Sequence, residues 1–271
     1  MVANAALAWP VVFSASSYVL RVLYNGVTQD LTLNVTPNRF YWMVGDGQVD
    51  AATLGGQGDL LRVLELLIET HSGAPAVTVT LDANFRLRVA VAANTIQLLW
   101  SHANTTLDTA GLGGANPFGY NGDTSLAAAV VSASMPQGLW RPQRPIWNDG
   151  RPQRPMIGGV GRSLAGGVRV SDFGQAARER SAFFGRLRQE QVLSEYAPST
   201  ALWGAFEFAW LNAWGLGRPW RLYEDEGQLA TGSSAYTLWR TVSKARPYQR
   251  NAENPPEALY WSARLLGAEV T

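Results

Sequence analysis

The chain has 271 residues, and with no cysteine and only two histidines it is excluded from disulfide scaffolds, thiolate enzymes and Cys- or His-rich metal proteins. Its 22 basic and 21 acidic residues leave a net charge of +1, too small to hold nucleic acid by charge alone. Only 16% of the residues are charged, against about 25% in typical soluble domains, which favours a surface covered by other subunits over a plain β-rich secreted domain.

The first part of the chain predicts strands on both sides of one helix. Asn25-Gly26 lies between two β-rich runs and is a strong hairpin signal. From Asp59 the apolar spacing changes to that of an amphipathic helix, which Gly73 terminates. The predicted strands are 18–23, 30–35, 40–44, 77–81, 87–91 and 96–100.

The middle of the chain, residues 111–155, predicts an extended arm or linker. It is rich in glycine and proline, and Arg-Pro-Gln-Arg-Pro occurs at 141–145 and again at 151–155. Each proline removes a hydrogen-bond donor and restricts the residue before it, which excludes a helix. Aromatic rings interleaved with arginines suit cation–π packing against another chain, although the same rings could stack on sugars. The candidate interface residues are Trp140, Arg141, Arg144, Trp147, Arg151 and Arg154.

The last part of the chain repeats the order of the first loosely. A helix is predicted at 200–214, ending at Gly215, and the predicted strands are 167–171, 181–192, 219–223, 235–242 and 258–266. We therefore expect a mainly β protein with few helices, made of β-barrel or sandwich units that each pack one helix. The expected organisation is a β-rich domain at 1–110 with a helix at 59–70, an arm or linker at 111–155, and a second β-rich domain at 156–271.

Catalytic groups are few and poorly placed. No Gly-x-Ser-x-Gly motif is present, and His102 fits a surface histidine after a strand better than a catalytic base. Asp46 lacks the spacing of a calcium loop, and Glu224-Asp225-Glu226 fits a solvated hairpin tip better than a carboxylate pair. Gly158-Gly159-Val160-Gly161 lacks the spacing of a nucleotide-binding loop. We expect no enzyme activity, cofactor or metal.

Membrane insertion and a secretory leader are not expected either. No apolar run reaches the roughly 18 residues that span a bilayer. The apolar start of the chain has no basic residue before Arg21, whereas a secretory leader begins with a basic stretch.

Four segments resemble virion structural proteins of tailed bacteriophages, and distal tail and baseplate hub proteins in particular. They are 38–43, 59–71, 95–108 and the Gly-Arg-Pro-Trp-Arg-Leu-Tyr-Glu-Asp run at 217–225. The resemblance implies a split β-barrel that assembles with copies of itself into a ring and docks other tail proteins. It implies no catalytic residues. It also implies a place in the virion tail after assembly in the host cytoplasm.

Three alternatives to a distal tail protein stay open at this point. The nearest keeps the virion and makes the chain a neck or head–tail connector, or a capsid decoration protein. The second is a carbohydrate-binding receptor-recognition module that uses Trp140 and Trp147. The third is a hydrolase, which would require Glu224, Asp225 or His102 in a pocket.

Overall fold

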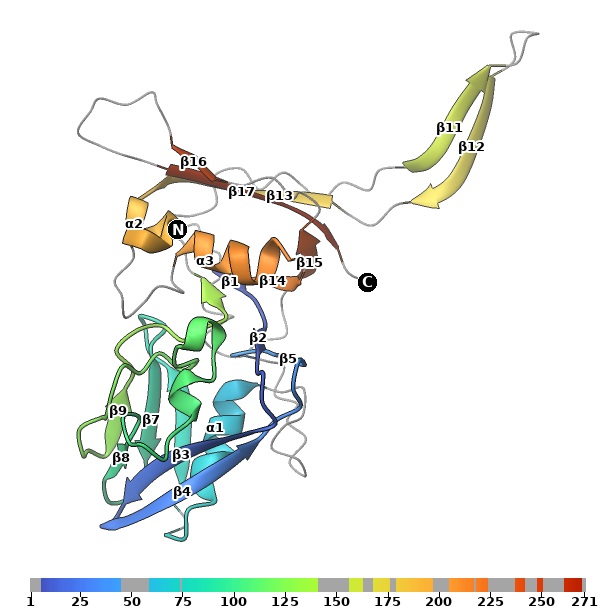
Figure 1. The fold of residues 1–271 in the computed structure, drawn as a ribbon. Coiled ribbons are helices and arrows are strands. Elements are labelled where there is room, and N and C mark those ends of the chain that lie inside the picture. The colour runs from blue at the N-terminus through green and yellow to red at the C-terminus, as the bar shows by residue number, and fades with distance from the viewer. Residues whose placement is uncertain are drawn as a thin grey trace.

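The computed structural model confirms a mainly β protein made of antiparallel sheets and a few short helices. It describes residues 6–44, 59–73, 75–140, 156–162, 168–175, 179–196, 205–216, 218–223, 237–241, 248–250 and 261–269. Figure 1 shows two lobes and a hairpin that projects from one of them. We call residues 11–138 the N-lobe, and the sheet that contains β1, β10 and β13–β17, with its helices, the C-lobe.

The predicted hairpin is part of the N-lobe. Strands β3 (Ser17–Tyr24) and β4 (Val27–Asn34) pair along their full length, and β8 (Ile96–Leu98) pairs with the other edge of β3. Asn25 and Gly26 have φ values of 48° and 77°, which is the left-handed pair that a two-residue hairpin turn requires. The strands predicted at 18–23 and 30–35 are therefore confirmed.

A second sheet and one helix complete the N-lobe. Strands β6 (Val77–Leu81), β7 (Leu87–Val91) and β9 (Ala129–Val131) form that sheet in the order β6-β7-β9. Helix α1 (Leu60–Glu69) is confirmed where it was predicted, and the Asp59 side chain caps it by accepting a hydrogen bond from the Leu61 amide at 2.9 Å. The short strands β2 (Val11–Val12) and β5 (Phe40–Tyr41) pair with each other.

The C-lobe is built on one seven-stranded sheet. Its order is β10-β1-β14-β15-β17-β13, with β16 paired to β17. The strands are β1 (Ala6–Ala8), β10 (Leu139–Trp140), β13 (Glu179–Leu187), β14 (Pro219–Tyr223), β15 (Thr237–Thr241), β16 (Tyr248–Arg250) and β17 (Trp261–Glu269). Strand β1, at the start of the chain, thus lies between β10 and β14. The C-lobe sheet therefore contains a strand from the expected first domain, 1–110, together with strands from the expected second domain, 156–271.

The helical parts of the C-lobe are shorter than predicted. The strand predicted at 181–192 ends at Leu187, and the helix α2 (Gln189–Val192) follows it. In place of one regular helix over 200–214, helix α3 (Phe206–Ala209) continues as a π-helical turn, η5 (Trp210–Trp214), and 200–204 lie outside the described residues. Within the described ranges, three further segments form 3₁₀ turns: η1 (Leu107–Thr109), η2 (Leu112–Gly114) and η3 (Ser194–Tyr196).

Residues 111–140 do not form the predicted arm. Phe118 and Tyr120 are buried in the N-lobe core, and Leu139 and Trp140 form β10 of the C-lobe sheet. Buried apolar side chains hold this segment against the body despite its glycines and prolines. Residues 141–155, the rest of the predicted arm, lie outside the described residues.

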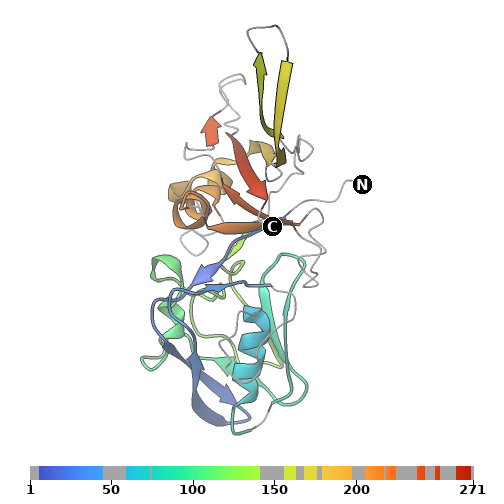
Figure 2. The ribbon, with the colours of Figure 1, turned by 90° about the vertical axis from the view of Figure 1, so that its right-hand side faces the viewer.

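The element that does project is a hairpin further along the chain. Strands β11 (Met156–Arg162) and β12 (Val168–Gln175) pair antiparallel, with Val160 opposite Val170. Both ribbon views show this hairpin extending away from the C-lobe (Figures 1 and 2).

Candidate functional site

The predicted interface residue Trp140 is part of the core. Its side chain is 1% exposed and meets the ring of Phe206 edge-on at 5.2 Å and that of Trp214 at 6.3 Å between ring centroids. The prediction of Trp140 as a contact residue for another chain, or for a sugar, is therefore wrong. Its ring is used inside the C-lobe, where burying a large aromatic contributes most to stability.

The other predicted interface residues cannot be placed. They lie outside the described residues, as do Asp46 and the acidic run at 224–226. The residues concerned are Arg141, Arg144, Trp147, Arg151 and Arg154.

The β11–β12 hairpin is the candidate interface that the structure adds. Within the described part of the chain its two strands form a sheet of their own and pair with no other strand. The outer edge of each strand therefore carries amide and carbonyl groups available to another chain. Part of β12 was predicted as a strand, but the three glycines of β11, at positions 158, 159 and 161, concealed β11 in the sequence.

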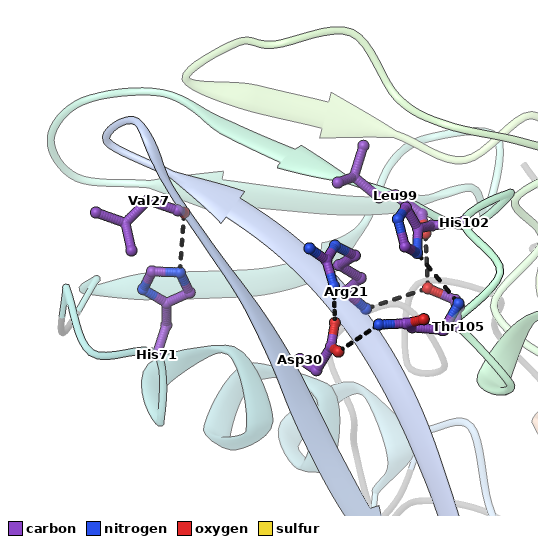
Figure 3. Close-up of polar contacts among 8 residues, drawn as sticks. Arg21, Val27, Asp30, His71, Leu99, His102 and Thr105 are labelled. Atoms are coloured by element: carbon purple, nitrogen blue, oxygen red, sulfur yellow. Dashed lines mark hydrogen bonds and ion pairs between the residues drawn. The ribbon is translucent and has the colours of Figure 1, made fainter.

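His71 is a structural residue. Its side chain is 2% exposed, and the ring packs edge-on against Tyr24. The Gly73 amide donates to Nδ1 at 3.0 Å, so the ring proton is on Nε2, which lies 3.2 Å from the carbonyl oxygen of Val27 (Figure 3). The ring thus ties the end of α1 to the β3–β4 hairpin.

His102 is exposed and belongs to a loop that docks on the same hairpin (Figure 3). Its Nδ1 accepts a hydrogen bond from the Asn104 amide at 3.1 Å. The Asn104 side chain donates to Asp30 at 2.7 Å, and Arg21 pairs with the same carboxylate at 2.8 Å. The hydrogen bond from Asn104 and the charge of Arg21 hold the pKa of Asp30 below its usual range. These contacts position the loop.

An open pocket of about 330 Å³ lies on the N-lobe, beside η1 and η2. Its wall combines aromatic rings, small residues, side-chain amides, hydroxyls and one carboxylate. The lining residues are Trp100, Ser101, Asp108, Thr109, Gly114, Ala115, Asn116, Tyr120, Asn121 and Gly122. Trp100 and Tyr120 stack with 5.1 Å between their centroids, which makes this part of the wall rigid.

Two groups of the pocket titrate away from their ordinary ranges. Burial raises the pKa of the Asp108 carboxyl, against hydrogen bonds from the backbone amides of Asp108 and Thr109. Burial also raises the pKa of the Tyr120 hydroxyl, so that this group is a neutral phenol at any physiological pH. Sequence reasoning missed the pocket because its residues come from separate loops without a motif.

Among the described residues, no three Asp, Glu or His side chains come close enough together to hold a metal ion. None of the helices in the described ranges has the length and apolar character that crossing a bilayer requires.

Comparison of the chain with protein-family models, with characterised proteins and with solved structures gives no match. The case for a function therefore depends on the chain's own residues and geometry.

Proposed function

We propose that this chain is a non-enzymatic structural subunit of a tailed-phage virion, a distal tail or baseplate hub component that forms a ring and docks neighbouring tail proteins. The observation that carries the assembly part of the proposal is the projecting β11–β12 hairpin. The phage setting is supported by the resemblance of the four sequence segments named above.

A two-stranded hairpin alone is marginally stable in water, because too little of it is buried to offset the ordering of its backbone. Strands of seven and eight residues that leave the body as a ribbon therefore need a partner surface. Further strands or a packed surface from a second copy would supply it.

In the proposed ring, the β11–β12 hairpin of one subunit contacts a different face of the next subunit. A hairpin that reaches from one subunit to a different face of the next makes a head-to-tail contact, and such contacts close into rings when the rotation between subunits permits. Two large apolar side chains on the C-lobe, Leu211 and Leu216, are 54% and 63% exposed and suit a covered surface. The low share of charged residues, 16%, is also consistent with a surface that another subunit covers.

Removing the hairpin tests the assembly. Residues 156–175 are replaced by a short Gly-Ser linker, and mass photometry and negative-stain images compare this variant with the intact chain. We expect the intact chain to form a discrete ring and the variant to be a monomer with the same thermal midpoint, because the hairpin extends away from the C-lobe. A chain that is monomeric at every concentration tested, or a variant that still forms the ring, contradicts this role.

The virion setting has its own test. Antibodies against the chain, with gold labels, are applied to virions from an induced host culture. Label at the tail tip supports a distal tail or hub component. Label at the neck or over the capsid supports the connector or decoration alternative instead, and unlabelled virions from a host that expresses the chain contradict the virion proposal.

A further inference from the structure

We propose that the pocket beside η1 and η2 is a binding site for one pyranose residue of a neutral sugar. The proposal does not depend on the assembly role above. It rests on the size of the pocket, on the sign of its charge and on the hydrogen-bonding groups of its wall.

The volume of the pocket and the charge of its wall limit which ligands can bind. About 330 Å³ lies at the lower end of the range for small-molecule pockets, which fits a single ring. Among the described residues that line the pocket, the Asp108 carboxyl is the only charged group, and none of them is Arg or Lys. Phosphates, sulfates and carboxylates would meet a like charge there without a cation to hold them. A neutral ligand is therefore favoured over an anion.

Two donors in the wall need acceptors. The indole Nε1 of Trp100 and the amide Nδ2 of Asn116 are buried, and neither has a hydrogen-bond partner among the described residues. The Phe118 amide donates to Oδ1 of Asn116 at 2.9 Å, which fixes the orientation of the Asn116 amide. Both side chains belong to residues that line the pocket. Leaving such donors unpaired costs free energy, so a ligand that supplies acceptors is stabilised.

The same wall supplies acceptors for hydroxyl protons. Asp108 is partly buried, and a hydroxyl hydrogen bond to a carboxylate is stronger than one to a neutral oxygen. Ser101, Thr109 and Asn121 add groups that both donate and accept. A ligand with oxygen acceptors and hydroxyl donors on one ring satisfies both sets, and a sugar is such a ligand.

Saturation-transfer NMR with free monosaccharides tests the site on the full chain. The sugars are glucose, galactose, mannose and N-acetylglucosamine, each added separately, and we expect saturation transfer to at least one of them. Asn116→Asp keeps the oxygen that Phe118 uses and removes the Nδ2 donor, so we expect it to weaken binding about tenfold. Asp108→Asn removes the charged acceptor and is expected to act in the same direction. The matched control is Asn84→Asp, the same change in an exposed turn outside the pocket.

A steric variant keeps the test valid if a polar substitution unfolds the chain. Gly122 lines the pocket, and a Cβ there would lie 3.5 Å from the Ser101 hydroxyl, which is an ordinary contact, so we expect Gly122→Leu to occupy part of the pocket. We expect this variant to keep the thermal midpoint and to lose the sugar signal. The proposal is overturned if none of the four sugars shows transfer to the intact chain, or if transfer survives Gly122→Leu unchanged.

Discussion

At the scale of single residues, Asp82 shows how one carboxylate organises a turn. It follows β6, and its Oδ1 accepts hydrogen bonds from the amides of Asn84 at 2.8 Å and Arg86 at 2.9 Å. Its Oδ2 accepts from Nε of Arg86 at 2.9 Å and pairs with Nη2 of the same guanidinium at 2.8 Å. These bonds close the β6–β7 connection, in which Phe85 adopts a positive φ of 59°.

We expect Asp82→Ala to lower the free energy of unfolding by about 1–2 kcal/mol at neutral pH, since it leaves two turn amides and a guanidinium without their acceptor. Desolvation acts to raise the pKa of Asp82, but the hydrogen bonds from Arg86 and Asn84 outweigh it and hold the pKa below the ordinary 3.8. The stabilisation is therefore present above about pH 4 and is lost as the pH falls through the lowered pKa. Urea unfolding at about pH 7 and about pH 3 should show the deficit shrink in acid.

The control for Asp82 is Asn84→Ala in the same turn. The Asn84 side chain is exposed, and only its backbone amide contacts Asp82, so we expect a change within about 0.5 kcal/mol. An equal loss in both variants, or a deficit of Asp82→Ala that grows in acid, would show that the carboxylate is not what stabilises the turn.

At the scale of elements, local signals predicted the N-lobe well. Asn25-Gly26 predicted the β3–β4 hairpin, and the apolar spacing of Leu60, Val63, Leu64 and Leu67 predicted α1. Both predictions were right because each signal acts between residues that are close in sequence. The placement of β1 and β10 in the C-lobe sheet could not be predicted, since it depends on pairing with strands far along the chain. The prediction for Trp140 was wrong for the same reason. It was based on the prolines and arginines that neighbour Trp140 in the sequence, whereas the aromatic residues that Trp140 contacts, Phe206 and Trp214, are distant in the sequence.

The junction of β1 and β10 gives a prediction at this scale. Gly138 precedes β10 with φ at +84°, and its carbonyl oxygen accepts from the Trp9 amide at 2.8 Å. A Cβ at Gly138 would lie 2.7 Å from the Trp9 carbonyl oxygen, so Gly138→Ala adds a backbone clash to the cost of a left-handed alanine. We expect it to lower the free energy of unfolding by about 3 kcal/mol, measured by denaturant titration.

Gly26→Ala is the matched comparison for Gly138→Ala. Gly26 has φ at +77°, but a Cβ there would meet nothing within 4 Å, so only the conformational cost of about 1 kcal/mol is expected. Losses of equal size at the two positions would mean that the contact between Gly138 and Trp9 adds nothing to the coupling of β1 with β10.

At the scale of the whole molecule, β1 joins the two lobes. Alternate residues of a strand face opposite sides. Ala6 and Ala8 pack in the N-lobe core, whereas Leu7 and Trp9 pack in the C-lobe core. Arg221 of β14 adds a second connection, donating to the Val44 carbonyl at 3.1 Å and lying 4.0 Å from the ring centroid of Trp42. Each core therefore loses part of its packing if the other unfolds.

This shared strand predicts one cooperative unfolding transition for both lobes, and the chain offers a natural probe of each. Tryptophan emission reports mainly on the C-lobe, whose core holds Trp9, Trp140, Trp210, Trp214, Trp220 and Trp239. The ring proton of His71, one of only two histidines, reports on the N-lobe. Both signals should change at the same denaturant concentration. Separate midpoints would mean that β1 and Arg221 do not couple the lobes. Ala8→Asp, which puts a charge into the N-lobe side of β1, should still lower both midpoints together, because the strand that it disrupts belongs to both cores.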